Sequence, residues 1–294
     1  MLYKPFELTS RTLISRGKKI RLNPARLMGI LNCTFDSFSD GSNFLNFDAA
    51  LKKAREMIDE GLDWLDIGGE SSGPGSSTVS LDEELNRVIP IIEAIRREND
   101  IWISVDTWKS EVARQSLEAG ADSINDVTAL RCDSEMSKVI SRFQVPVVLM
   151  YSKDVSPRTT RESLDYDDVM SNIKNFFRER LEFAQSKGIN KEQIILDPGM
   201  GFFISSKAKY SFEVVSRISE LHEFDLPILL GPSRKSFLSP SSNGEKTNFE
   251  ERDIPGAAVS SIALWQGISV LRYHEVYQGR LLIDTIESIK NNLK

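Results

Sequence analysis

Short apolar runs alternate with longer amphipathic segments from residue 27 to the end of the chain. The runs have no polar face, which indicates strands buried on both sides, and the longer segments carry apolar residues at helical spacing. The expected strands are 27–31, 64–67, 102–105, 123–124, 147–150, 194–196, 228–230 and 270–271. The expected helices are 48–60, 82–97, 110–119, 134–143, 166–187, 210–221, 255–266 and 281–293.

This alternation predicts an α/β fold with a parallel sheet. Eight strand and helix pairs in about 270 residues match a closed (β/α)8 barrel, the TIM barrel. An open doubly wound sheet alternates in the same way, but no GxGxxG follows the first strand and polar residues follow nearly every strand. We therefore expect a single domain over residues 1–294, in which residues 1–26 form an N-terminal β-hairpin.

Composition narrows the class of partner. The 294 residues carry a net charge of -6 with acids and bases interspersed, so no basic surface for nucleic acid is indicated. Two cysteines and two histidines leave little material for a disulfide framework, a multi-histidine metal site or a Ser-His-Asp hydrolase. Without a signal peptide or a membrane-length apolar run, we expect a cytoplasmic protein with small-molecule substrates and no membrane partner.

Carboxylate and amide side chains follow three of the expected strands. In a barrel the ends of the strands converge on one face, so Asp106, Asn125 and Asp197 would surround one pocket. Such acceptors suit a planar heterocycle with several N–H groups. The alternatives are that the two aspartates cap the following helices and that the asparagine satisfies loop backbone. A metal site is a weaker option because asparagine and lysine separate the carboxylates.

A second group of strand-end residues is basic. Lys235 follows the seventh strand, and Arg272 and His274 are two positions apart at the end of the eighth, so these two face the same way. Phosphate often binds at the last strands of a barrel, so this group indicates anion recognition. An ion pair between Arg272 and Asp66 or Glu70 is the structural alternative.

Two loops are candidates for closure over a substrate. The first, residues 32–41, reads NCTFDSFSDG and carries Phe35 and Phe38 without an obvious core to enter. This composition predicts a loop that excludes water and presents Asp36. The second loop, residues 70–77, reads ESSGPGSS and would act as a partner lid.

Seven blocks then carry a family resemblance: MGILNCTFDSFSDG, LDIGGESSGPG, ISVDTWK, INDV, ILDPGMGF, GPSRKSF and LRYHEV. Over residues 15–290 the chain resembles dihydropteroate synthase, a TIM-barrel transferase of folate biosynthesis that is usually a homodimer. The resemblance implies condensation of 4-aminobenzoate with (7,8-dihydropterin-6-yl)methyl diphosphate to give 7,8-dihydropteroate and diphosphate. It also implies Mg²⁺ as the cofactor, with the metal assisting C–O cleavage before the arylamine attacks.

The resemblance further implies roles for individual residues. Catalysis would depend on Asp36, Lys235 and Arg272. The pterin would bind to Ser72, Asp106, Asn125, Asp197 and Lys235. The diphosphate would contact Asn32, Arg272, Tyr273 and His274, and Asn32 would also meet the Mg²⁺. The aminobenzoate would lie against Pro74, Phe202 and Ser236.

Four positions depart from the residues usual in that family: Phe35 replaces a proline, Gly73 an arginine, Tyr151 a histidine and Ile204 a lysine. The changes fall on the two loops and the aminobenzoate pocket, and Lys207 or Lys209 is a candidate for the missing cation. The segment GMGFFISS resembles divergent, sulfonamide-insensitive members of the family, which predicts weak sulfonamide binding.

Two other functions remain open from the sequence. A pterin-dependent methyltransferase would keep the aspartate and asparagine set, but it has no need for the basic group, and no corrinoid-binding domain is present in the sequence. A catalytically inactive pterin-binding paralogue would keep the pterin residues and lose the second substrate site. Retention of the basic group argues for the active transferase.

Overall fold

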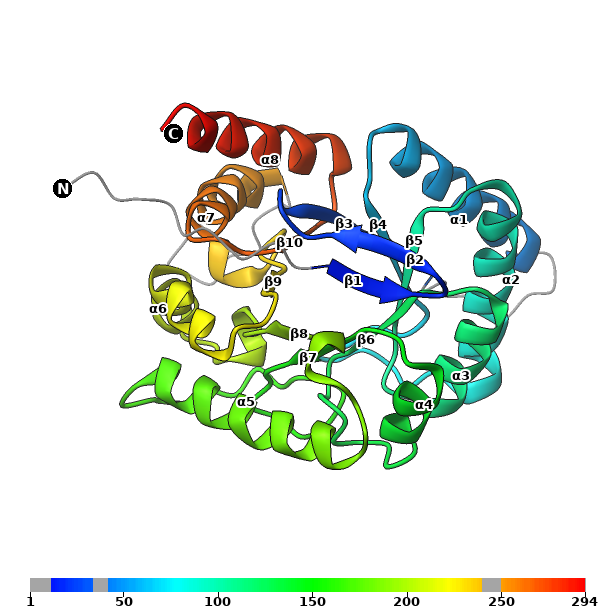
Figure 1. Cartoon of the computed structure of the whole chain (residues 1–294), viewed down its shortest axis with the longest axis horizontal. Helices are drawn as coiled ribbons and strands as arrows, with labels where there is room; N and C mark the ends of the chain where they lie inside the picture. The colour runs from blue at the N-terminus through cyan, green and yellow to red at the C-terminus, as the bar shows by residue number, and fades with distance from the viewer. Residues whose placement is uncertain (1–11, 34–41, 240–249, 294) are drawn as a thin grey trace.

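Eight parallel strands alternate with eight α-helices within residues 12–33, 42–239 and 250–293, which the computed structural model describes (Figure 1). The barrel strands are β3 (Arg26–Asn32), β4 (Trp64–Gly68), β5 (Trp102–Asp106), β6 (Ser123–Asp126), β7 (Val147–Met150), β8 (Ile194–Asp197), β9 (Leu229–Leu230) and β10 (Val270–Tyr273). The helices are α1 (Ser42–Asp59), α2 (Leu81–Glu98), α3 (Ser110–Ala119), α4 (Met136–Phe143), α5 (Val169–Ser186), α6 (Ala208–Arg217), α7 (Asp253–Trp265) and α8 (Val276–Asn291).

The parallel sheet closes on itself. Its strand order is β8-β7-β6-β5-β4-β3-β10-β9, and a parallel bridge between Leu196 and Ile228 joins the two ends. The Leu196 N–H also donates a 2.9 Å hydrogen bond to the Pro227 carbonyl. The helices lie outside the strands (Figure 1), so the predicted (β/α)8 barrel is confirmed and the open sheet is excluded.

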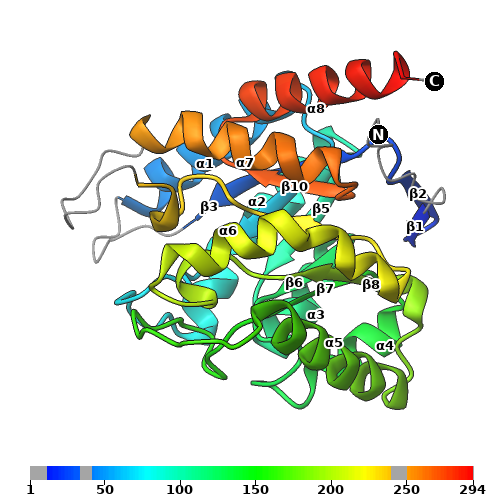
Figure 2. The same cartoon turned by 90° about the vertical axis from the view of Figure 1, so that its left-hand side faces the viewer.

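An antiparallel hairpin closes one end of the barrel, as predicted (Figure 2). Strands β1 (Thr12–Ser15) and β2 (Lys18–Arg21) are joined by a turn in which Arg16 and Gly17 have φ values of 52° and 77°. Leu13 and Leu22 are buried against apolar residues near the starts of the barrel strands, namely Met28, Trp64, Trp102, Val148, Ile195, Leu229 and Val270. The hairpin therefore covers the end opposite the strand termini that carry polar residues.

The barrel interior changes from apolar to polar along several of the strands. Side chains alternate between the interior and the helices, so the residue two positions after an inward apolar residue also faces inward. On β4 this residue is Asp66, after Trp64, and on β10 it is Arg272, after Val270. On β8 it is Asp197. Polar groups thus collect inside the C-terminal end of the barrel.

Each helix turns an apolar stripe toward the strands, and α2 illustrates why. Ser80 caps its first turn by accepting a 3.2 Å hydrogen bond from the Glu83 N–H, and acids follow at its start and arginines at its end. Val88, Ile92 and Ile95 are buried toward the barrel. None of the described helices is long and apolar enough to span a bilayer.

Helix α8 begins at Val276 rather than at the expected position 281. The first turn of this helix contains Gly279, and glycine is a poor helix former. In the structure a Cβ on Gly279 would lie 2.6 Å from the Leu27 side chain, so the glycine permits close packing inside the helix. Close packing against β3 explains the earlier start.

Candidate functional site

A cavity of about 680 Å³ opens at the C-terminal end of the barrel, within the size range of small-molecule sites. It brings together predicted residues that are distant in sequence. Its wall includes Asn32, Pro74, Phe202, Lys235, Ser236, Arg272 and His274. Members of the predicted diphosphate, pterin and aminobenzoate groups therefore share one pocket.

The floor beside this cavity holds a buried network centred on Arg272. Its Nε lies 2.7 Å from Oδ2 of Asp66 and its Nη2 lies 2.9 Å from Oδ2 of Asp106. The Asn125 amide donates a 3.0 Å hydrogen bond to the same Asp66 oxygen. The ion pair left open from the sequence therefore forms with Asp66. The capping alternative for Asp106 is wrong, because α3 begins after Lys109 with no side-chain cap.

Asp197 and Lys235 complete the floor. Asp197 accepts a 2.8 Å hydrogen bond from the Gly199 N–H, and burial raises the pKa of its carboxyl to about 6 although this bond and Lys235 oppose the shift. Burial likewise lowers the pKa of Lys235 to about 8 against the attraction of Asp197. Burial and neighbouring Asp66 raise the pKa of Asp106 despite Arg272.

These six residues, which we call the inner set, are Asp66, Asp106, Asn125, Asp197, Lys235 and Arg272. Their polar atoms are largely withdrawn from water and only partly paired: Oδ1 of the fully buried Asp66 has no hydrogen-bond partner among the described residues. Acceptors in this state bind a ligand's N–H groups strongly, because little hydration is lost when the bond forms. Asn125 and Asp197 are buried, and Asp106 lines a smaller adjoining pocket.

His274 faces the main cavity, but it is not a cation. Its Nδ1 lies 3.0 Å from Oγ of Ser233. Burial, with the positive charges of Arg272, Arg234 and Lys235, lowers the pKa of His274 to about 3. The ring is therefore neutral at pH 7 and contributes hydrogen bonding rather than charge, which corrects the interpretation of His274 as part of a cationic group.

Tyr273 does not contribute its side chain to the site. The residue alternates outward from the barrel and is buried between helices, where its hydroxyl would lie 3.5 Å from a Cβ on Gly256 of α7. The prediction that this tyrosine binds diphosphate is wrong for its side chain. The error arose because the motif LRYHEV was carried over as a block, whereas only alternate residues of a strand face the interior.

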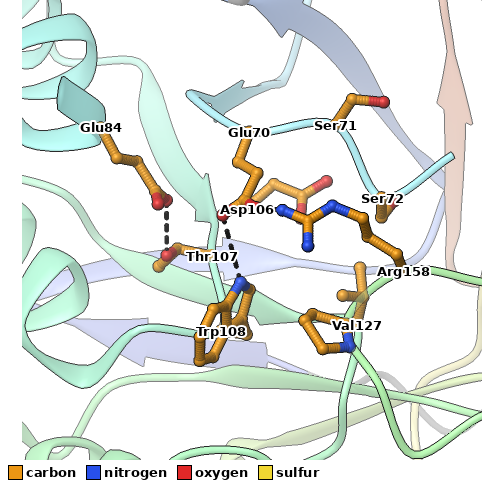
Figure 3. Close-up of a pocket in the computed structure, with 10 residues that line it drawn as sticks. Glu70, Ser71, Ser72, Glu84, Asp106, Thr107, Trp108, Val127 and Arg158 are labelled. Atoms are coloured by element: carbon orange, nitrogen blue, oxygen red, sulfur yellow. Dashed lines mark hydrogen bonds and ion pairs between the residues drawn. The ribbon is translucent and has the colours of Figure 1, made fainter. Parts of the chain in front are cut away.

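The second loop, residues 70–77, contacts segments that are distant in sequence, and its role as a lid stays a prediction. Glu70 forms ion pairs with Lys109 (2.7 Å) and Arg158, and the Ser72 carbonyl accepts a 3.2 Å hydrogen bond from the Thr159 N–H. Figure 3 shows the side chains of Glu70, Arg158 and Asp106 gathered in the smaller pocket. Ser72 lines this smaller adjoining pocket rather than the main cavity, so it lies near Asp106 as the pterin assignment requires.

The positions that depart from the family's usual residues lie in different surroundings. Gly73 lines the cavity. Ile204 and Tyr151 belong to the buried core, and the Tyr151 hydroxyl lies 3.1 Å from that of Tyr166. Asp36 and Phe35 lie in the first loop, outside the described residues, so their assignments stay predictions.

The described residues contain no cluster of three or more histidine, cysteine or acidic side chains that could hold a metal by themselves. Asn32, at the exposed end of β3, offers one amide oxygen to the cavity. Mg²⁺ commonly takes few protein ligands and completes its shell with substrate phosphates and water. The donor set therefore fits a magnesium ion that arrives with a phosphorylated substrate.

Sequence reasoning missed two contributors. Asp66 was considered only as an ion-pair partner, although an acid at an inward position of an otherwise apolar strand is itself a signal of a polar interior. Arg161, in the segment after β7, also lines the cavity. No periodicity marks a residue in an irregular segment, so pattern analysis could not have found it.

Comparison with known proteins agrees with this geometry. Residues 28–274 match the model of the pterin binding enzyme family. The chain is 40% identical to the dihydropteroate synthase of Synechocystis, over 90% of this chain and 89% of the relative. It is 39% identical to that of Escherichia coli K12, over 95% and 98%.

Solved structures that resemble this chain are also dihydropteroate synthases. The dihydropteroate synthase of Yersinia pestis, solved with a sulfonamide drug, superposes with a TM-score of 0.86 at 37% identity, covering 96% of this chain and 99% of that one. That of Xanthomonas albilineans, solved with 4-aminobenzoic acid, has a TM-score of 0.86 at 35% identity with the same coverage. The chain belongs to the pterin-binding enzyme family and, within it, to the dihydropteroate synthases.

Proposed function

We propose that the cavity joins 4-aminobenzoate to (7,8-dihydropterin-6-yl)methyl diphosphate and releases diphosphate. The observation that carries this proposal is the order of chemistry along one cavity. Arg272, which lines the cavity, pairs with the buried acceptors Asp66 and Asp106 behind it. Asn32 and His274 lie in the same wall, and loop residues such as Pro74 and Phe202 add apolar surface. A pterin needs buried acceptors, a diphosphate needs basic and amide groups, and an arylamine ring needs apolar side chains.

The inner set would hold the pterin. Asp197 and Asp106 present carboxylate oxygens to ring N–H groups, and Asn125 presents an amide that can both donate and accept. Lys235 donates to ring carbonyl oxygen, and its charge beside Asp197 keeps that carboxyl ionised at pH 7. Arg272 fixes the positions of Asp66 and Asp106 through its two ion pairs.

The wall residues would hold the diphosphate. Arg272, neutral His274 and Asn32 offer donors or oxygen ligands where the leaving group departs. Asn32 would hold Mg²⁺, which would supply further positive charge to stabilise the leaving group. Asp36 would help to order the first loop over that end of the site.

The reaction then needs no strong base. The C–O bond between the pterin methylene and the diphosphate breaks, and the electron pair leaves with the diphosphate. The arylamine nitrogen donates its lone pair to the methylene carbon and loses a proton to water or to the departing diphosphate. Pro74, Phe202 and Ser236 would position the arylamine ring for this attack, and orientation of this kind accounts for much of catalysis.

The test is product formation by the purified protein with Mg²⁺ and dihydropterin diphosphate, with and without 4-aminobenzoate. We expect diphosphate release and dihydropteroate formation that both require 4-aminobenzoate. Binding of the pterin diphosphate without product would contradict the proposal and favour the inactive pterin-binding paralogue.

We further propose that the enzyme is a cytoplasmic homodimer, consistent with two free cysteines. Helices α7 and α8 pack side by side and leave large apolar side chains exposed, among them Ile262 (50%), Tyr277 and Leu281. A second copy of the chain would cover this face. Light scattering should give twice the chain mass, and Ile262→Glu should give the monomer.

Weak sulfonamide binding is also proposed. Gly73 and Ile204 leave the arylamine end of the cavity without the cations usual in the family, and a sulfonamide would compete for that end. Inhibition of the purified enzyme by sulfamethoxazole with the same affinity as a typical member would contradict this proposal.

A further inference from the structure

The segment between β7 and α5 forms a strap, residues 153–166, across the outer part of the cavity. On one side the Thr159 N–H donates to the Ser72 carbonyl (3.2 Å). On the other side Thr159 Oγ1 donates to the Phe202 carbonyl (2.8 Å), and the Lys153 N–H donates to the Phe203 carbonyl (2.8 Å). The strap thus joins the second loop to the segment that carries Phe202.

Two further contacts hold the strap. Arg158 forms an ion pair with Glu70, and both side chains are drawn in Figure 3. Towards its far end the Leu164 N–H donates to Oγ of Ser205 (3.1 Å), and Ser205 Oγ donates in turn to the Leu164 carbonyl (2.8 Å). A residue in the middle of the strap is therefore positioned by contacts on both sides, although the segment has no regular secondary structure.

Arg161 occupies that middle position and faces the cavity. Its guanidinium carbon lies 5.7 Å from the centre of the Phe202 ring, within the range of a cation–π contact, and its side chain lines the cavity with Pro74. The structure gives Arg161 no ion pair among residues 12–33, 42–239 and 250–293. A positive charge therefore stands beside the aromatic wall with its hydrogen-bonding capacity uncommitted to a carboxylate.

The other cations of the cavity wall are engaged elsewhere. Arg272 pairs with two aspartates of the floor, Arg234 pairs with Glu275, and Arg252 donates to the Arg234 carbonyl (2.9 Å). Lys235 belongs to the inner set.

The two lysines considered from the sequence are also excluded. Lys207 pairs with Asp165 (2.5 Å), Lys209 lies 4.5 Å over the Tyr210 ring, and neither lines the cavity. Among the described residues beside Pro74 and Phe202, Arg161 is the cation that remains.

The geometry of the arylamine decides what this cation does. In 4-aminobenzoate the amine and the carboxylate lie at opposite ends of the ring. If the amine points to the reacting methylene at the floor, the carboxylate points out toward the strap. We infer that Arg161 binds the substrate carboxylate and selects arylamines with an anionic para substituent. This inference rests on the proposed function.

The test compares Arg161→Ala, Arg161→Lys and the control Lys138→Ala, which removes an exposed cation outside the strap and the cavity wall, in steady-state kinetics. Arg161 is exposed, so its truncation should leave the fold intact. Loss of a charge-assisted hydrogen bond should raise KM for 4-aminobenzoate by about 10-fold or more in Arg161→Ala. The KM for the pterin diphosphate and kcat should change less than about twofold.

The controls separate binding of charge from a structural effect. Arg161→Lys keeps the charge and should recover part of the affinity, and Lys138→Ala should behave as wild type. An unchanged KM for 4-aminobenzoate in Arg161→Ala, or equal increases in both KM values, would overturn the inference. If the wild type makes no product, the proposed function fails, and calorimetric affinities of 4-aminobenzoate for the same variants decide the inference separately.

Discussion

The floor of the cavity is built from strand residues, whereas its outer wall is built from loop residues. Most of the inner set lies at the ends of barrel strands, and Asp66, Asp106, Asn125 and Arg272 are linked by direct bonds. Arg161, Phe202 and Pro74 of the outer wall are held in place by the strap. The floor is thus fixed by the fold itself, and the wall is fixed by a few hydrogen bonds between loops. The two parts should respond differently to substitution.

Removal of Arg272 should have the largest effect. Arg272→Ala leaves the fully buried Asp66 without its cation, and breaking such a pair destabilises proteins by about 3–5 kcal/mol. We also expect kcat/KM to fall by about 100-fold or more for both substrates, because the floor loses its alignment and the leaving group loses a donor. Urea unfolding and steady-state kinetics measure the two effects.

A second substitution tests whether an unpaired buried carboxylate causes this loss of stability. Asp66→Asn combined with Arg272→Ala removes one of the two carboxylates that lose their cation, so it should recover part of the stability and little of the activity. Recovery of both would contradict the assignment of Arg272 to the diphosphate.

The pKa of Asp197 predicts an acid limit to activity. The carboxylate must be ionised to accept hydrogen bonds from the pterin, so kcat/KM for the pterin diphosphate should fall as the pH decreases through about 6. Stability should respond in the opposite direction. The folded pKa exceeds the ordinary value of 3.8, so ionised Asp197 lowers stability at pH 7, and this cost fades as the pH falls from 6 toward 4.

Asp197→Asn separates these two effects. The variant should lose about 10-fold or more in pterin affinity, and its residual activity should lack the acid limb near pH 6. Its unfolding free energy at pH 7 should be no lower than that of the wild type. An acid limb that persists unchanged would assign the titration to another group, such as Asp106.

The sequence predicted the floor much better than the wall. A buried strand ends at a definite residue, and the barrel places all such residues on one face, so Asp106, Asn125, Asp197 and Lys235 could be found from apolar periodicity. Orientation within a strand was also available from the sequence, and neglecting it produced the error at Tyr273.

The wall depends on contacts that no local pattern records. Arg161 stands beside Phe202 only because Thr159 and Arg158 bind segments far away in sequence. The contacts of residues 70–77 could not be predicted for the same reason. A loop rich in serine and glycine looks flexible until its tertiary partners are known.

A substitution within the strap should have the smallest effect on the kinetic constants. Thr159→Val keeps the shape of the side chain but removes the 2.8 Å hydrogen bond to the Phe202 carbonyl. A neutral hydrogen bond of this kind corresponds to about a threefold to tenfold change, which should fall on KM for 4-aminobenzoate. Ser288→Ala, which removes a hydroxyl from α8 far from the cavity, is the matched control. An equal change in KM for the pterin diphosphate would show that the strap supports the whole site.

The division of the cavity into a pterin floor and an arylamine wall is tested most directly by calorimetry. The affinity of the dihydropterin diphosphate, with Mg²⁺ present, is measured for the wild type, Asp197→Asn and Arg161→Ala. We predict a loss of about 10-fold or more for Asp197→Asn and less than about twofold for Arg161→Ala. Equal losses in the two variants, or a loss confined to Arg161→Ala, would contradict the division.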